Sequence, residues 1–162
     1  MKKLSLLFFL TALMQLSFAQ QNKKTDKQIA VKNLIDSSRF IFYPQTAMPM
    51  RGNVQQVTPD FDITITKDTI ICYLPYYGRA YSAGYGDNTS PLNFTSTKFN
   101  YTVKEKTKGG WDISIITKDT KENTELNLSV SVNGYGSLRA SSNNREPISF
   151  TGYITERKIN HQ

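Results

Sequence analysis

A tyrosine-rich stretch offers the clearest binding chemistry in the chain. Residues 74–86 read LPYYGRAYSAGYG and place four tyrosines, one arginine and three glycines in thirteen positions. Tyrosine rings stack on sugars, peptide side chains or planar ligands, and a guanidinium clamps a carboxylate or a phosphate. The pattern predicts a ligand-binding loop with two candidate neighbours elsewhere in the chain. The predicted binding residues are Tyr76, Tyr77, Arg79, Tyr81, Tyr85, Trp111 and Arg145.

The same loop also has a structural interpretation. Pro75 cannot donate a ladder hydrogen bond, so the preceding strand ends or reaches an edge there. The rings would then cover one end of the fold, and Arg79 would pair with an internal carboxylate or with carbonyl groups of its own loop. Arg145 becomes a second anion contact only if its turn, SSNNREPI, lies at the same end. Trp111 belongs either to the core or to the rim of a ligand mouth.

The single cysteine and the single histidine do not form a catalytic pair. Cys72 alternates with Ile70 and Leu74 in the run TIICYL, which predicts a small buried side chain on an apolar face. A catalytic thiol needs a histidine partner, and His161 lies one residue from the end of the sequence. With one cysteine, no intramolecular disulfide can form.

The carboxylates are scattered along the chain. Asp60 and Asp62 flank Phe61 at a predicted strand entrance, where an aspartate is an ordinary turn residue. Asp119 and Glu122 fall in a predicted loop, together with Glu125, and we expect them to be solvated. No spacing matches a calcium loop or another metal site. We therefore expect no catalytic residues, no metal ion and no cofactor.

The first nineteen residues have the pattern of an export signal. A basic start, Lys2 and Lys3, precedes an apolar run and small residues near Ala19, where we expect cleavage. The formal charge of +7 contains those two lysines, so the mature chain carries a mild positive charge without a basic helix or stripe. We expect an exported periplasmic or envelope protein with no transmembrane segment in the mature chain, and no nucleic-acid partner.

The rest of the chain is predicted to be one β-rich domain over residues 27–158, with a disordered linker over 20–26 and a disordered tail over 159–162. Residues 25–37 have helical spacing of apolar side chains. Thereafter the period is two: RFIFYP, FDITI and TIICYL are followed by six further runs, separated by clusters such as KGG, DTKEN, NGYG and NNRE. Residues 45–60 are predicted to be a long connection. Alternating apolar and polar positions predict an antiparallel barrel or two-sheet sandwich of eight or nine strands with a short N-terminal helix.

Two motifs carry a family resemblance. LPYYGRAYSAGYG and the ending NGYGSLRASSNNREPISFTGYI resemble the exported family catalogued as domain of unknown function 4251, found mostly in Bacteroidetes. Tyr77 stands where the family pattern has a phenylalanine, and Glu146-Pro147 replaces a more usual polar and small pair. The resemblance implies a signal peptide and a helix before the first strand. It implies no activity and no catalytic residue.

These observations favour a non-enzymatic exported binding module. Its ligand would be a small hydrophobic molecule, a glycan or a peptide held by the tyrosine loop. The alternative is a structural or interaction component of the envelope that docks another protein, and a third possibility is a hydrolase whose carboxylates converge only in the fold. An enclosed cavity at Tyr81 would favour the first, whereas an exposed aromatic surface without a cavity would favour the second.

Overall fold

One antiparallel sheet runs through the described part of the chain, which comprises residues 26–81 and 90–157 of the computed structural model. A helix over residues 26–37 precedes it. The strands are β1 (Phe40–Pro49), β2 (Gln55–Gln56), β3 (Asp62–Ile65), β4 (Ile70–Tyr73), β5 (Asn93–Ser96), β6 (Phe99–Glu105), β7 (Trp111–Thr117), β8 (Glu125–Val130), β9 (Tyr135–Ser142) and β10 (Arg145–Thr155). Nine of them form a continuous path, and the short β2 pairs only with β1.

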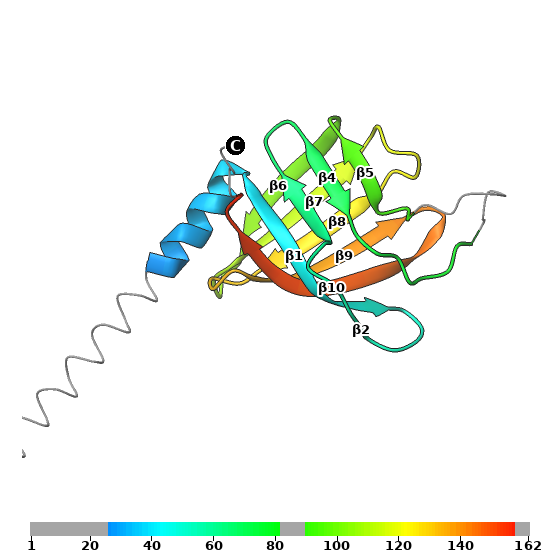
Figure 1. Ribbon diagram of the computed structural model, residues 1–162. Helices are drawn as coiled ribbons and strands as arrows, with labels where there is room; N and C mark the ends of the chain where they lie inside the picture. Colours follow the sequence, from blue (N-terminus) through cyan, green and yellow to red (C-terminus); the bar gives the residue numbers. More distant parts are fainter. Residues whose placement is uncertain (1–25, 82–89, 158–162) are drawn as a thin grey trace, which may run out of the picture.

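The sheet rolls up into a nearly closed barrel (Figure 1). Its order is β5-β4-β3-β1-β10-β9-β8-β7-β6, so strands that follow one another along the chain are mostly neighbours in space. Pairing of β1 with β10 joins the first and last strands, which leaves β5 and β6 as the two edges. The predicted mainly-β fold is confirmed, and the nearly closed barrel is the form it takes.

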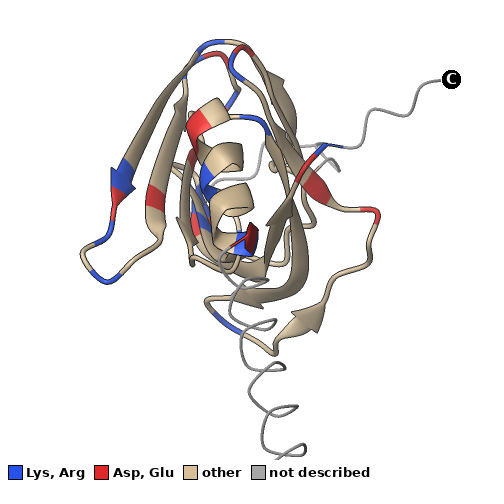
Figure 2. Cartoon of the chain, turned by 90° about the vertical axis from the view of Figure 1, so that its left-hand side faces the viewer, with Lys and Arg blue, Asp and Glu red and all other residues tan. Residues whose placement is uncertain are grey.

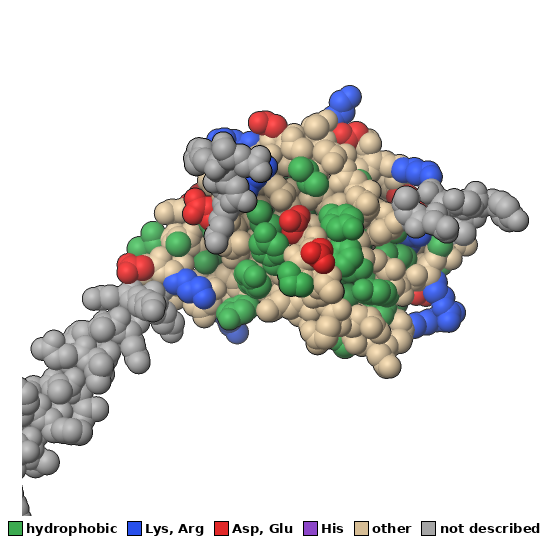
Figure 3. Space-filling view, in the orientation of Figure 1, with side chains coloured by type: hydrophobic (Ala, Val, Ile, Leu, Met, Phe, Trp, Pro, Cys, Tyr) green, Lys and Arg blue, Asp and Glu red, His purple; other side chains and the backbone are tan. Residues whose placement is uncertain are grey.

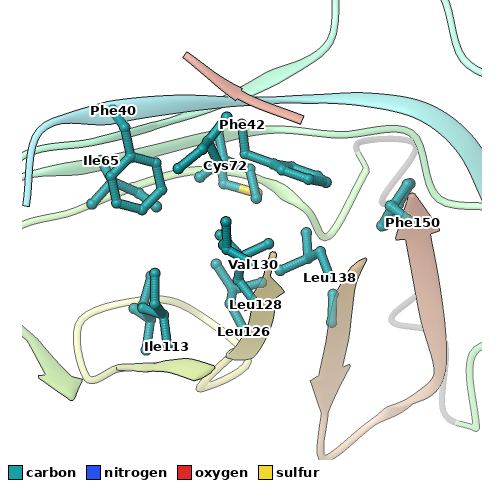
Figure 4. Packing of buried hydrophobic residues seen from close by; sticks show 14 of the residues in the cluster. Phe40, Phe42, Ile65, Cys72, Ile113, Leu126, Leu128, Val130, Leu138 and Phe150 are labelled. Atoms are coloured by element: carbon teal, nitrogen blue, oxygen red, sulfur yellow. The ribbon is translucent and has the colours of Figure 1, made fainter. Parts of the chain in front are cut away.

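Alternation of side chains explains where the core lies. In β7 and β8 every second residue is buried, and the same holds for β4 and for most of β10. The inward residues of the two halves of the sheet meet in the barrel interior, where Phe40, Phe42 and Cys72 face Leu128 and Val130 (Figure 4). Cys72 is fully buried, as predicted, and burial raises the pKa of its thiol far above the ordinary value.

The N-terminal helix lies in the mouth of the rolled sheet (Figure 2). Its apolar residues Val31 and Ile35 are buried in the same core as the strands. The Val31 side chain also approaches Gly134, where an added Cβ would lie 3.2 Å from Val31 Cγ2. The predicted helix is therefore confirmed, and it covers one opening of the barrel. No helix among the described residues is long and apolar enough to cross a membrane.

The long connection predicted for residues 45–60 is partly wrong. Residues 45–49 continue β1 as far as Pro49, and Gln55–Gln56 returns as β2. The β1–β10 register shifts between Pro44 and Thr46. Proline has no N–H group to donate to a ladder, and the register irregularity allows β1 to continue past Pro44.

The corner between β5 and β6 is held by Asp119, which the sequence placed in a solvated loop. Its carboxylate accepts hydrogen bonds from Ser96 Oγ, from Thr97 N at 2.8 Å and from Lys98 N at 3.0 Å. These hydrogen bonds, the one from Ser96 foremost, lower the pKa of Asp119 to about 2. Asp119 therefore links the two edge strands that lack a mutual ladder.

Protonation of Asp119 is expected to weaken this corner within a narrow range of acidic pH. Because the folded-state pKa is depressed, the stabilisation by Asp119 is fully present above its ordinary value of 3.8 and is lost as the pH falls towards 2. Thermal unfolding of wild type and Asp119→Asn, measured from pH 6 to pH 2, should show a difference in melting temperature that shrinks below about pH 4. Asp68→Asn, in the β3–β4 turn, is the matched control and should change the melting temperature little. A difference between wild type and Asp119→Asn that is independent of pH would contradict the prediction.

Candidate functional site

Tyr76 ties the tyrosine loop to the start of β10. Its hydroxyl donates to the Glu146 carbonyl oxygen at 2.7 Å and lies 3.1 Å from the Arg79 carbonyl oxygen. A Cβ at Gly78 would lie 2.5 Å from the Tyr76 hydroxyl oxygen, so the ring folds closely over this glycine. This close packing accounts for Tyr76 and Gly78, and Tyr76 acts as a clasp between two segments that are distant in the chain.

Backbone hydrogen bonds complete the clasp. Tyr81 N donates to Asn144 O at 2.8 Å, and Glu146 N donates to Arg79 O at 3.0 Å. Ala80 and Arg145 form an isolated antiparallel bridge. The tyrosine loop and the SNNR turn thus lie at the same end of the barrel, which sequence periodicity left open.

Arg145 makes the internal ion pair that the structural interpretation assigned to Arg79. Its Nε lies 2.9 Å from Glu122 Oε1 and 3.1 Å from Oε2, and Ser142 Oγ donates to Glu122 Oε2 at 3.1 Å. Its guanidinium carbon is 5.7 Å from the Tyr76 ring centroid, within the range of a cation–π contact. Arg145 therefore fastens the β7–β8 loop to the clasp, and the expectation of a solvated Glu122 is wrong.

Three other loop residues point outward. Tyr77 and Tyr81 are 46% and 67% exposed, and the Arg79 side chain is also exposed. The loop therefore divides into an inward residue, Tyr76, and an exposed set, Tyr77, Arg79 and Tyr81, which we call the loop surface. Tyr85 lies outside the described residues.

Trp111 does not join this site. It is 6% exposed and belongs to the core, and it is the first residue of β7. Cross-strand pairs align Trp111 with Val130 and Val130 with Gly136, which in turn faces Gly152. Arg145 lies at the opposite end of β10 from Gly152. The pairing register therefore separates Trp111 from the loop, and only the core interpretation of this residue fits the structure.

Comparison with known proteins identifies the family. A family model described as "Domain of unknown function (DUF4251)" matches residues 22–154. The chain belongs to the DUF4251 family. A crystal structure of a DUF4251 family protein from Bacteroides eggerthii DSM 20697 superposes with a TM-score of 0.60 at 10% sequence identity, covering 80% of this chain and 87% of that chain. At that identity the likeness concerns the fold. A search of the curated proteins finds no match.

In this DUF4251 protein, little space lies beneath the described part of the tyrosine loop. A cavity of about 10 Å³ lies there, lined by Tyr76, Arg145 and Glu146 among others. That volume is close to what one water molecule occupies. A groove of about 530 Å³ lies on β6, β7 and β8, and no predicted loop residue lines it. Among the residues that the structure describes, Tyr77, Arg79 and Tyr81 of this DUF4251 protein therefore form an exposed surface above a cavity of about one water molecule.

The carboxylates beside the clasp form ion pairs with arginine side chains. Glu122 pairs with Arg145, and the buried Glu146 has Arg51 Nε 3.7 Å from its Oε1 atom. Within residues 26–81 and 90–157 there is no group of three or more His, Cys, Asp or Glu side chains that could hold a metal ion. Sequence reasoning missed Glu122 and Glu146 as partners of the site because neither lies near the tyrosine loop in the chain.

Removing the Tyr76 hydroxyl is expected to destabilise this DUF4251 fold. Tyr76→Phe leaves the partly buried Glu146 carbonyl without its donor, so we expect a loss of about 1–2 kcal/mol in the free energy of unfolding at pH 7. Urea unfolding measures it, and Tyr77→Phe is the control with an expected change within about 0.5 kcal/mol. Equal effects of the two substitutions would contradict the clasp.

Ionisation of the Tyr76 hydroxyl is expected to reduce the stability of the protein at alkaline pH. Burial raises the pKa of Tyr76 to about 12, although the nearby Arg145 opposes the shift. A raised folded-state pKa means that the stabilisation is fully present below the unfolded pKa of about 10 and is lost as the pH rises through the folded value. The stability difference between wild type and Tyr76→Phe should therefore shrink between about pH 10 and pH 12, which urea unfolding across that range tests.

Proposed function

We propose that this protein is an exported, non-enzymatic docking protein whose loop surface binds a partner protein. The observation that carries the proposal is the division within one short loop: the Tyr76 hydroxyl is hydrogen-bonded inward, whereas Tyr77, Arg79 and Tyr81, at alternate positions of the chain, are exposed. Tyrosine and arginine are the residue types that contribute most to protein interfaces. A single exposed tyrosine is common on protein surfaces. Two exposed tyrosines and an arginine on one hydrogen-bonded loop favour recognition of a partner protein.

Preorganisation supports this function. The base of the loop surface is held by the Tyr76 hydroxyl and by the two backbone hydrogen bonds to the SNNR turn. A binding loop that is already ordered loses less conformational entropy on association. The Arg145–Glu122 ion pair fastens the turn in its own position. The loop surface therefore presents its side chains from a rigid support.

The small cavity favours a partner protein over an enclosed small molecule. About 10 Å³ beneath the loop cannot hold a drug-sized ligand, which needs a few hundred Å³. An exposed aromatic and cationic surface suits contact with another surface, in particular one that carries a carboxylate for Arg79. The N-terminal pattern of residues 1–19 supports export, and we place the partner in the cell envelope.

Quantitative pull-down from an envelope fraction tests the proposal. We expect the wild-type protein to retain a partner that the variant Tyr77→Ala/Arg79→Ala/Tyr81→Ala loses, with an unchanged melting temperature. The matched control is Val103→Ala/Lys104→Ala/Ile116→Ala, which removes two exposed hydrophobic side chains and one cation from β6 and β7. The control should retain the partner. Equal retention by both variants would reject docking by the loop surface.

A further inference from the structure

A second aromatic surface crosses the outside of the sheet. Strand pairing places Tyr73 opposite Asp62, Tyr43 opposite Tyr153, and Tyr153 opposite Tyr135. The β1–β3 register brings Phe42 opposite Ile63, so the next positions, Tyr43 and Asp62, are neighbours as well. One row of outward residues thus runs over β4, β3, β1, β10 and β9. We call this row, together with Phe61, the aromatic platform.

The rings of the platform are accessible and lie close to one another. Tyr135, Tyr73 and Tyr153 are 61%, 44% and 39% exposed. The Phe61 and Tyr73 rings stack with centroids 5.0 Å apart, and the Tyr43 and Tyr153 centroids are 5.8 Å apart. Figure 3 shows hydrophobic side chains gathered across this face of the molecule, with acidic side chains among them. At about 4.8 Å between neighbouring strands, the row extends over roughly 19 Å.

A carboxylate lies in the middle of the platform. Asp62 separates the Phe61–Tyr73 pair from the Tyr43–Tyr153 pair and is half-buried. Burial raises the pKa of its carboxyl group, and the positive charge of Arg157 opposes the shift. At neutral pH an aspartate accepts hydrogen bonds and donates none. The platform therefore combines aromatic faces with one carboxylate acceptor.

We propose that the aromatic platform binds a neutral oligosaccharide. The C–H face of a pyranose ring stacks on a tyrosine or phenylalanine ring, and its hydroxyl groups donate to a carboxylate and to phenolic oxygens. The length of the row suits several consecutive sugar units. A nucleic acid also stacks on aromatic rings, but its phosphates require a series of cations along the chain. Two cations lie near the row: Lys27 Nζ is 5.5 Å from the Tyr135 ring centroid, and the positive charge of Arg157 acts on Asp62. The Asp62 carboxylate between the two pairs of rings disfavours an acidic sugar beside it.

This proposal stands apart from the docking function. The platform lies on the outer face of five strands, whereas the loop surface consists of residues 77, 79 and 81, and none of these belongs to the row. Substitution of one surface leaves the other intact. A Tyr81→Ala variant is therefore a matched control for the platform, since it removes an exposed tyrosine outside the row.

The test uses cellohexaose, chitohexaose and hexagalacturonate as probes with the mature full-length protein. We expect amide resonances of residues 43, 62, 73, 135 and 153 to shift on addition of cellohexaose or chitohexaose, and calorimetry to give the affinities. Tyr153→Ala and Tyr73→Ala should each weaken binding by about tenfold, the effect expected of one stacked ring. Asp62→Asn should also weaken it, and Tyr81→Ala should leave it unchanged. Each variant is first checked for wild-type melting temperature.

Several outcomes would overturn the proposal. Absence of shifts with both neutral saccharides at about 10 mM would do so, since weaker binding is not specific recognition. So would shifts confined to the loop surface, tighter binding of hexagalacturonate than of the neutral probes, or unchanged binding by Tyr153→Ala and Asp62→Asn. If the platform variants instead lose a protein partner and no saccharide binds, the surface is a protein interface and the saccharide assignment is wrong.

Discussion

Arg145→Ala is expected to lower the free energy of unfolding by about 3 kcal/mol, because removing one partner of a largely buried ion pair leaves the other charge uncompensated. The Arg145 and Glu122 side chains are 18% and 15% exposed, and Arg145 Nε lies within hydrogen-bond distance of both carboxylate oxygens. The substitution also removes the guanidinium from the Tyr76 ring. Urea unfolding at pH 7 measures the loss.

A double-mutant cycle separates the ion pair from general disruption. Arg145→Ala, Glu122→Gln and the double variant should give a coupling energy of at least about 1 kcal/mol, because the two residues are in direct contact. Arg139→Ala is the matched control: Arg139 is exposed on the outer face of β9, and its loss should change stability by no more than about 0.5 kcal/mol. Similar effects of Arg139→Ala and Arg145→Ala would refute a structural role for the pair.

Gly152→Ala is expected to destabilise the protein by about 3 kcal/mol, at the upper end of what overpacking usually costs. A Cβ at this position would lie 2.0 Å from Tyr43 O and 2.9 Å from Pro44 Cα. Both atoms belong to the backbone of β1, so the strands that join the two ends of the meander would have to separate. Urea unfolding measures the loss, and amide exchange should show faster opening of the β1–β10 ladder.

Gly136→Ala is the matched control for the glycine prediction. Gly136 pairs with Gly152 across β9 and β10, but a Cβ there would meet the Leu128 Cδ1 atom at 3.1 Å and the Phe42 ring at 3.3 Å. Side-chain atoms can shift where a backbone cannot. Gly136→Ala should therefore cost less than Gly152→Ala, and the reverse order would show that contact with the β1 backbone is not the reason for a glycine at residue 152.

Much of the fold follows from local pattern. The period-two alternation of β7 and β8 predicted their buried faces, and the helical spacing of Val31 and Ile35 predicted the N-terminal helix. These predictions are sound because alternation and helical periodicity are properties of the strand and the helix themselves. The course of residues 45–60 was predicted less well, because the segment is polar and contains two prolines and a glycine, and only its pairing with β10 shows that β1 continues to Pro49.

The candidate site depended on contacts that no local pattern contains. The sequence singled out Tyr76, Arg79 and Arg145, yet which arginine pairs with a carboxylate was decided by Glu122 on the β7–β8 loop. Trp111 was assigned to the core, with the rim of a ligand mouth as the alternative, and the strand register places it at the other end of β7 from the Glu122 loop. The aromatic platform had no sequence signal, because its five rings come from four strands and the segment before β3.

By itself, the sequence determined the alternation of buried and exposed positions, the helix before the first strand and the break at Pro75, because each depends on neighbours a few residues apart. Only the tertiary structure decided that Tyr76 turns inward while Tyr77 and Tyr81 stay exposed, that Arg145 pairs with Glu122, and that the outward tyrosines line up in one row. The physical reason is that these contacts join segments far apart in the chain: strand register aligns the outward tyrosines, since a shift of one residue would send them to the other face, and the loops meet only where the paired strands bring them together.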